Sequence, residues 1–462
     1  METYIDEQCI VNTLQNVTVD SYAIKEILAK AKELKGLDSK DVAILSAIST
    51  EMANELYETA DYIKKQIYGN RIVLFAPLYI SNYCANDCVY CAFRASNRTI
   101  KRNYLTMEQI KCEVETLVEQ GHKRLLLVAG EAYPPYSSNK RGLQYILDAI
   151  ENVYSVKKRN GEIRRLNVNI APLTVEEFKE LKAAKIGTYQ LFQETYHKDT
   201  YSKVHPKGKK ADYLWRLFAM DRAMEAGIDD VGIGVLFGLF DWKFELLAMM
   251  QHIQHLEKNF GVGPHTISVP RIEPAIDTPF SQNPPYRVSD DDFLKIIAIL
   301  RCAVPYTGII LSTREDPLMR KKALMLGVSQ ISAGSKTNPG GYSLNDDVDA
   351  QFSIGDHRSL DEVIYDLISM GFIPSFCTAC YRLGRTGEDF MDKAKPGLIK
   401  QFCTPNGMAT FMEYLLDYAS EKTQSKGMAL IQSMMQQMEP PIAARTQKLL
   451  QQIKKGKRDV YC

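Results

Sequence analysis

The chain has 462 residues, of which 45% are hydrophobic and 24% charged, a composition typical of a globular protein with a sizeable core. Its 57 Lys and Arg residues balance 56 Asp and Glu residues, which argues against nucleic acid or an anionic membrane as a partner. The first residues, METYIDEQCI, lack a secretory signal, and no segment is apolar for long enough to span a bilayer, so we expect a cytoplasmic protein.

Residues 1–70 are expected to form an N-terminal helical extension. In the segments 19–34 and 39–69, apolar residues recur at close to the 3.6-residue period of an amphipathic helix, with Asp and Ser at plausible N-caps. Neither segment contains the alternating pattern of a half-buried strand, so the prediction for this part of the chain is helix alone.

Residues 71–345 show a regular alternation of short apolar runs with amphipathic stretches such as 105–122 and 290–304. This alternation predicts a parallel sheet. Eight strand–helix units predict a closed (β/α)8 TIM-type barrel, and thus the α/β fold class. The expected strands are RIVLFAPLYI, KRLLLVAG, RRLNVNIA, GTYQLFQE, DDVGIGVLFG, HTISVPRI, TGIILST and SQISAG.

Residues 346–462 are expected to form a C-terminal helical domain. Strand patterns end after residue 350, and residues 405–455 have helical periodicity with a break at the Pro-Pro pair, Pro440 and Pro441. The chain is therefore predicted to consist of a helical extension, a barrel and a helical C-terminal domain.

The loop NYCANDCVYCAF, residues 82–93, follows the first expected strand, so it opens at the end of the barrel where such enzymes hold their active sites. It carries Cys84, Cys88 and Cys91. Polar neighbours argue against three buried apolar cysteines, and the missing fourth ligand argues against structural zinc. An iron–sulfur cluster is the interpretation that remains, and three thiolates on a four-iron cluster leave one iron open to an outside ligand.

A second set of three cysteines lies near the C-terminus. FCTACYRLGRTGEDFM (376–391) and KQFCTPNG (400–407) supply Cys377, Cys380 and Cys403. Zinc is the alternative for a CxxC pair, although a fourth ligand is again missing. These three thiols therefore form a second candidate metal-binding set.

The CxxxCxxC spacing, with Tyr90 before the last cysteine, resembles the signature of radical S-adenosylmethionine (SAM) enzymes. The resemblance implies a 4Fe–4S cluster whose open iron binds SAM, so that the cofactor carries the hard chemistry. VAGEAY (128–133) resembles the superfamily's Gly-Glu motif, which implies SAM contacts for Gly130 and Glu131. The alternative for this motif is a turn with an exposed carboxylate.

Together with SVPRIEPA (268–275), the C-terminal cysteines resemble those of the tyrosine lyases that mature FeFe-hydrogenase. This resemblance, which covers essentially the whole chain, implies cleavage of the Cα–Cβ bond of L-tyrosine to p-cresol and dehydroglycine. Dehydroglycine is then converted to carbon monoxide and cyanide for an iron carbonyl cyanide unit. The implied partners are hydrogenase maturation proteins and an electron donor.

The same resemblance implies an auxiliary 4Fe–4S cluster with an additional iron, held by the C-terminal domain over the active face of the barrel. His265 is the implied protein ligand of that iron, with a structural histidine as the alternative. Two other functions stay open: a tyrosine lyase of another pathway, such as thiamine biosynthesis, and an iron–sulfur scaffold protein without radical chemistry.

A buried amino-acid carboxylate favours arginine, whose planar guanidinium binds it through two hydrogen bonds. Arg271 and Arg314 end the sixth and seventh expected strands, and related lyases imply Arg314 with Ser335 for this role. Ion pairs with neighbouring acidic residues are the alternative for both arginines. Gln193 and Glu194, which end the fourth strand, are candidates for SAM contact. The basic stretch VHPKGKKADY (204–213) is expected to be a solvated loop.

Overall fold

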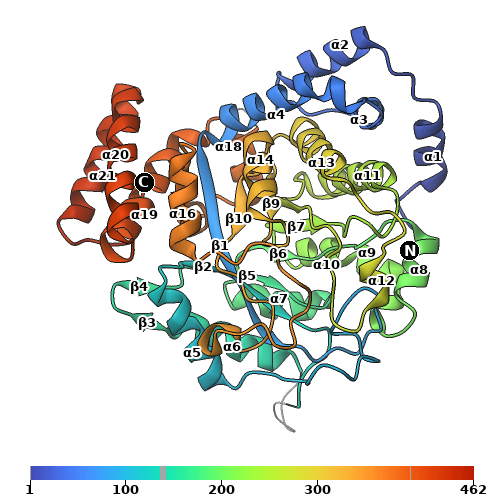
Figure 1. Ribbon diagram of the computed structural model, residues 1–462, viewed down its shortest axis with the longest axis horizontal. Helices are drawn as coiled ribbons and strands as arrows, with labels where there is room; N and C mark the ends of the chain where they lie inside the picture. The colour runs from blue at the N-terminus through green and yellow to red at the C-terminus, as the bar shows by residue number, and fades with distance from the viewer. Residues whose placement is uncertain (1, 136–141, 396) are drawn as a thin grey trace.

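The computed structural model describes residues 2–135, 142–395 and 397–462 (Figure 1). The N-terminal helical extension is confirmed. The N-cap residues of its first three helices are Asp6, Asp20 and Asp38. Their side chains accept hydrogen bonds from backbone amides in the first turn of each helix. Its helices are α1 (Glu7–Gln15), α2 (Ser21–Ala31), α3 (Ser39–Ser46) and α4 (Ala53–Tyr68).

All eight expected strands form a parallel barrel. They are β1 (Arg71–Ser81), β2 (Arg124–Ala129), β5 (Arg165–Asn169), β6 (Tyr189–Gln190), β7 (Val231–Gly234), β8 (Thr266–Ser268), β9 (Gly308–Leu311) and β10 (Gln330–Ser332). The strands follow one another around the barrel in sequence order, with a small hairpin, β3 (Lys157–Lys158) and β4 (Gly161–Glu162), outside it. The barrel closes because β10 pairs with β1, so the prediction of a (β/α)8 fold is confirmed.

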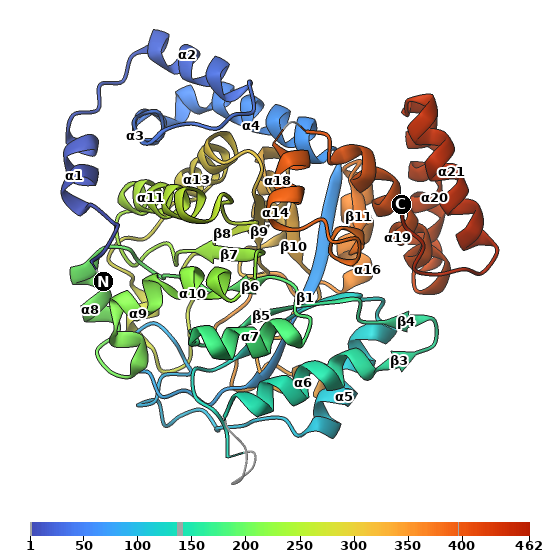
Figure 2. The same cartoon turned by 180° about the vertical axis from the view of Figure 1, so that it is seen from behind.

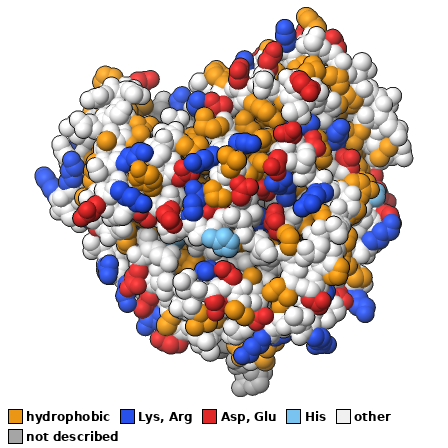
Figure 3. Space-filling view, viewed as in Figure 1, with side chains coloured by type: hydrophobic (Ala, Val, Ile, Leu, Met, Phe, Trp, Pro, Cys, Tyr) orange, Lys and Arg blue, Asp and Glu red, His pale blue; other side chains and the backbone are white. Residues whose placement is uncertain are grey.

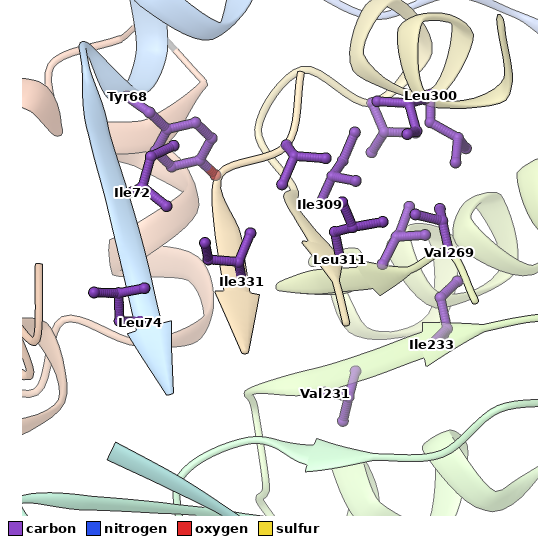
Figure 4. Close-up of a cluster of buried hydrophobic side chains, with 14 of the residues drawn as sticks. Tyr68, Ile72, Leu74, Val231, Ile233, Val269, Leu300, Ile309, Leu311 and Ile331 are labelled. Carbon is purple, nitrogen blue, oxygen red and sulfur yellow. The ribbon is translucent and has the colours of Figure 1, made fainter. Parts of the chain in front are cut away.

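Helices cover the outside of the barrel, and side chains of alternate strand residues pack against them. Figure 4 shows Ile331 of β10 between Ile72 and Leu74 of β1 on one side and Ile309 and Leu311 of β9 on the other, with Leu300 of the helix α13 (Asp290–Ala303) on the side of β9. The other helices around the barrel are α5 (Met107–Glu119), α6 (Leu143–Ser155), α7 (Val175–Ala183), α8 (Lys198–Val204), α9 (Tyr213–Leu217), α10 (Ala219–Glu225), α11 (Trp242–Phe260), α12 (Pro279–Gln282), α14 (Pro317–Leu326), α15 (Gly341–Leu344) and α16 (Leu360–Ser369).

The C-terminal region is helical, as predicted, but after α16 it contains a strand that the sequence pattern did not indicate. Strand β11 (Ile373–Ser375) is three residues long and pairs in parallel with Arg71–Val73, the first residues of β1. It was missed because so short a strand, with a proline at its centre, has no recognisable period. The helices that follow are α17 (Ala379–Arg382), α18 (Gly387–Ala394), α19 (Lys400–Asp417), α20 (Glu421–Gln437) and α21 (Pro440–Lys454).

Helices α19, α20 and α21 form a layer of their own beside β11 and α16, and the N-terminal helices lie elsewhere on the barrel (Figures 1 and 2). Charged side chains of both signs are interspersed over the face seen in Figure 3. Within the described ranges, no helix combines the length and the apolar character needed to cross a membrane.

Candidate functional site

The first cysteine loop leaves the C-terminal end of β1 and lines a cavity inside the mouth of the barrel. Cys84, Cys88 and Cys91 all contribute to this lining, and none is in a disulfide. Burial raises the pKa of Cys84 and Cys91 to about 11 and that of Cys88 to about 12. The thiols therefore keep their protons at neutral pH unless a metal displaces them.

Polar side chains fix the shape of this loop. Arg102 donates to the backbone carbonyls of Asn82 and Phe93, each through Nη1, at 2.9 and 2.8 Å. Asn86 donates through Nδ2 to Glu131 at 2.8 Å and accepts the backbone amide of Lys210 at 3.0 Å. The loop is thus tied to β2 and to the chain after α8 before any ligand is bound.

Two carboxylates and two cations form a buried network on one wall of the cavity. Arg216 donates to Glu131 at 2.8 Å, and the ammonium of Lys210 lies 2.7 Å from a carboxylate oxygen of Glu194. Burial favours a raised pKa for Glu131, but the charges of Arg216 and Lys210 outweigh it and hold this pKa below its usual value. Glu131 and Glu194 therefore face the cavity as fixed carboxylates.

The expectation that residues 204–213 form a solvated loop is wrong for its most important residues. Lys210 is buried in the network just described, and buried His205 lies 2.8 Å through Nε2 from the hydroxyl of Tyr90. Lys207 and Lys209 are exposed, which is why the local composition resembled a surface loop. The sequence carried no signal that one lysine of three points inward.

The cavity encloses about 1430 Å³, part of it open to solvent, and reaches from the cysteine loop to the ends of β8, β9 and β10. The candidate residues Tyr90, Gly130, Glu131, Glu194 and Arg314 line it. Gly130 is needed here, because a Cβ atom on it would lie 2.2 Å from the carbonyl oxygen of Tyr83.

The two candidate arginines differ. The guanidinium of Arg314 contacts the carbonyl of Arg271 at 3.5 Å and the ring of Phe352, and forms no ion pair in the described part of the chain. Arg271, in contrast, forms ion pairs with Glu315 and Asp290 and is not part of the cavity lining. The ion-pair alternative is therefore correct for Arg271, although its partners are not the neighbour Glu273.

Two other candidates do not line the cavity. Gln193 and Ser335 are buried, and their Nε2 and Oγ atoms have no hydrogen-bond partner among the described residues. Sequence reasoning also missed Gln351, which follows the barrel in the chain. Its Nε2 lies 3.7 Å from the sulfur of Cys91, and its Oε1 accepts from Tyr79 at 2.7 Å.

The second set of cysteines lies at the opposite end of the barrel, so the expectation that it would cover the active face is wrong. Strand β11 pairs with the first residues of β1, and the chain therefore reaches Cys377 beside the start of β2. Arg124, the first residue of β2, donates to the carbonyl of Cys377 at 2.7 Å. Cys380 is hydrogen-bonded to Cys403, which raises the pKa of Cys380 and lowers that of Cys403.

The charges around this second set suit an anionic group. Arg71 and Arg124 are buried, and the Nε atom of each has no hydrogen-bond partner in the described chain. Burial favours a lowered pKa for Arg71, but Cys403, Cys377 and nearby groups raise it overall. Buried cations are costly unless a negative charge lies near them. A cluster held by three thiolates would supply that charge.

His265 precedes β8 and so lies at this same N-terminal end of the barrel. Its Nε2 is 3.0 Å from the hydroxyl of Tyr381, the residue after Cys380, and its Nδ1 is 3.8 Å from Asp230. Burial lowers the pKa of His265, and the charge of Asp230 only partly opposes this shift, so the ring is neutral. Neutral imidazole is the form that binds metals.

In the described ranges, no three His, Cys, Asp or Glu side chains converge on a single metal ion. The fit to iron–sulfur groups therefore rests on the donor chemistry and its surroundings. At one end of the barrel, three thiols share a cavity with two fixed carboxylates. At the other end, three thiols lie beside two buried arginines and a neutral histidine.

Two family descriptions match the chain. The Radical SAM superfamily matches residues 78–250, and the Biotin and Thiamin Synthesis associated domain matches residues 268–373. The chain is 34% identical to the 2-iminoacetate synthase of Escherichia coli over 351 residues. The matched region covers 75% of this chain and 88% of that enzyme.

Two solved structures resemble the whole chain. One is a crystal structure of HydG, described as a maturase of the FeFe-hydrogenase, with a TM-score of 0.95, 50% identity and coverage of 99% of this chain and 100% of that chain. The other is HydG from Carboxydothermus hydrogenoformans, with a TM-score of 0.81, 41% identity and coverage of 96% and 99%. These matches include the C-terminal helices.

Proposed function

The chain belongs to the HydG family of radical SAM maturases, and from that premise we propose that it cleaves the Cα–Cβ bond of L-tyrosine to p-cresol and dehydroglycine. Dehydroglycine is then converted to carbon monoxide and cyanide, which are assembled on iron as a precursor of the hydrogenase active site. The observation that carries this proposal is the placement of two cysteine sets at opposite ends of one barrel.

Cys84, Cys88 and Cys91 would hold the 4Fe–4S cluster, and Gly130 and Glu131 would contact SAM. When bound, this cluster and SAM supply the radical that abstracts a hydrogen atom from the substrate. The residues of this chain contribute the electrostatic surroundings and the exclusion of water. The network around Glu131 keeps a fixed negative charge where a SAM amine can bind, and the barrel excludes bulk water.

Arg314 would bind the carboxylate of tyrosine, because it is the cavity arginine without an ion-pair partner in the described chain. A planar guanidinium at the end of a strand holds a carboxylate in one orientation. The amine and the Cα–Cβ bond of tyrosine would then lie in a fixed position relative to SAM.

Cys377, Cys380 and Cys403 would hold the auxiliary cluster, and His265 would bind the additional iron, which is a substrate of the assembly reaction. Arg71 and Arg124 support this assignment, since they offset the negative charge of thiolate-bound iron. The 34% identity to a 2-iminoacetate synthase supports the first half of the chemistry, and the likeness to HydG over 99% of the chain supports the second half.

The test is anaerobic turnover of the reconstituted protein with SAM and L-tyrosine. We expect 5′-deoxyadenosine and p-cresol, whereas a scaffold protein would form neither. Cys84→Ala, Cys88→Ala and Cys91→Ala should each abolish both products. Cys302→Ala is the control, because Cys302 is a buried free cysteine that lies outside the cavity. Full 5′-deoxyadenosine formation by any of the first three variants would contradict the assignment.

A further inference from the structure

The two ring nitrogens of His265 face two different oxygen groups. Nε2 lies 3.0 Å from the hydroxyl of Tyr381, and Nδ1 lies 3.8 Å from Oδ1 of Asp230. At 3.8 Å the carboxylate acts on Nδ1 through its charge rather than through a hydrogen bond, and this negative charge favours the tautomer that carries the ring proton on Nδ1 and leaves a lone pair on Nε2. The hydroxyl of Tyr381 then donates to the one nitrogen of this ring that is free to bind a metal.

Asp230 is itself held in place by neighbouring side chains. Its Oδ2 lies 2.7 Å from Nη2 of Arg165, and its Oδ1 accepts from the hydroxyl of Thr188 at 3.1 Å. The cation of Arg165 therefore lies directly against the carboxylate of Asp230 and balances its negative charge. Asp230 is therefore a fixed carboxylate beside the histidine.

Tyr381 connects the histidine to the second cysteine set. It directly follows Cys380, and the guanidinium of Arg165 lies over its ring. The ring of His265 also packs against Phe390 with a centroid distance of 4.4 Å. The imidazole thus has apolar and aromatic contacts on its faces, and its position is set before iron binds.

We propose that Asp230 positions His265 for iron and that the hydroxyl of Tyr381 is a latch that occupies Nε2 until iron displaces it. This inference rests on the proposed function, in which His265 binds the additional iron. On loading, the Tyr381–His265 hydrogen bond breaks and an iron–Nε2 bond forms, and no proton leaves the imidazole. The latch lowers iron affinity and keeps the histidine from binding other ions.

The two positioning residues should have effects of opposite sign. Tyr381→Phe removes only the competing hydroxyl, so the dissociation constant of iron should fall by about 2- to 10-fold, the value of one net hydrogen bond. Asp230→Asn removes the charge that fixes the tautomer, so this dissociation constant should rise by about 10- to 100-fold. A variant that merely damaged the fold could not bind iron more tightly.

The experiment titrates ferrous iron anaerobically into protein whose two clusters have been reconstituted and whose additional iron has been removed. Binding is followed by the electron paramagnetic resonance spectrum of the auxiliary cluster and by iron analysis, so no turnover is needed. Tyr196→Phe is the matched control. Its hydroxyl also lies next to a buried imidazole, 2.7 Å from Nδ1 of His252, but outside this site, and its iron affinity should be unchanged.

Failure of the inference and failure of the proposed function give different results. If His265→Ala binds iron as well as the unmodified protein, the assignment of His265 as ligand is wrong, and the inference falls with it. If His265→Ala loses iron while Tyr381→Phe binds it equally or more weakly, only the latch is wrong. Unchanged iron affinity in Asp230→Asn would overturn the positioning role of that carboxylate.

Discussion

At the scale of single residues, a charged side chain is available to bind a ligand only where no ion-pair partner already occupies it. Arg271 and Arg314 both follow strands at the active end of the barrel, yet Arg271 is occupied by Glu315 and Asp290, and Arg314 has only a carbonyl and an aromatic ring in the described chain. A guanidinium already paired with two carboxylates gains little from a third. Arg314 is the residue available to a substrate.

We predict that Arg314→Ala weakens tyrosine binding. Loss of a buried charged contact costs about 2–5 kcal/mol, so the apparent KM for tyrosine should rise by about 30-fold or more. Affinity for SAM should change much less, which equilibrium binding of each ligand would measure. Arg271→Ala is the comparison, and we expect it to lower stability, because it leaves buried Glu315 unpaired. Normal tyrosine affinity in Arg314→Ala would exclude this residue as the anchor.

At the scale of elements, the short strand β11 has the largest consequence for the chemistry. Its pairing with the first residues of β1 places Cys377 and Cys380 beside the N-terminal ends of the strands. The first cysteine loop leaves the other end of β1. That end, Ser81, lies eight residues after Val73, the last residue of β1 that pairs with β11. One long strand thus separates two sites that should fail independently.

We predict that Cys377→Ala combined with Cys380→Ala leaves tyrosine cleavage intact. Carbon monoxide should fall sharply and the iron carbonyl product should disappear, because the auxiliary cluster would be lost while the first cysteine set is untouched. Measuring p-cresol and carbon monoxide in the same anaerobic reaction separates the two steps. Proportional loss of both products would indicate that the C-terminal region supports folding or substrate closure instead.

At the scale of the whole molecule, buried charges attach the C-terminal helices to the barrel. Glu413 of α19 lies 2.8 Å from Arg164 and 3.3 Å from Lys123, and these three side chains are 0–2% exposed. The backbone amide of Asp459 also donates to Glu413. Removing one member of such a group leaves its partners charged and unpaired in the interior.

We predict that Glu413→Ala destabilises the protein by about 3–5 kcal/mol, since buried Lys123 loses its carboxylate and Arg164 keeps only Asp459 as an ion-pair partner. Denaturant unfolding would measure this, and limited proteolysis should cleave the C-terminal helices first. Glu176→Ala is the control, because the Glu176–Lys179 pair is exposed and its loss should cost under about 1 kcal/mol. Equal effects of both variants would argue against a role for burial.

Acid should also destabilise the fold through His122, a buried histidine whose ring nitrogens have no hydrogen-bond partner among the described residues. Burial lowers its pKa to about 3, whereas the unfolded chain should titrate near about 6.5. The contribution of neutral His122 to the free energy of unfolding is therefore complete above about pH 6.5. It is lost as the pH falls toward 3, at about 1.4 kcal/mol per pH unit.

The measurement is the free energy of unfolding of the unmodified protein and of His122→Leu at several values between pH 7.5 and pH 5. The unmodified protein should lose more stability than the variant below about pH 6.5, and the two curves should run parallel above it. Parallel curves over the whole range would mean that His122 is not kept neutral in the folded state.

Local sequence patterns predicted the eight barrel strands, and the cysteine sets could be read directly from the chain. The motifs also named Tyr90, Gly130, Glu131 and Arg314 as candidates, and these residues line the cavity. Strand and helix periods are local properties, and a loop that follows a parallel strand must open at the C-terminal end of a barrel. These inferences therefore needed no knowledge of distant contacts.

Only the folded structure shows which end of the barrel the second cysteine set occupies. It also shows that Arg314 rather than Arg271 has no ion-pair partner in the described chain, and that Lys210 is buried. It also brought Asp230 and Tyr381 to His265 across 35 and 116 positions of sequence. Each of these depends on which strand edge or carboxylate a segment meets in the folded chain. A local pattern carries no such information, because pairing between distant residues is set by packing and burial rather than by periodicity.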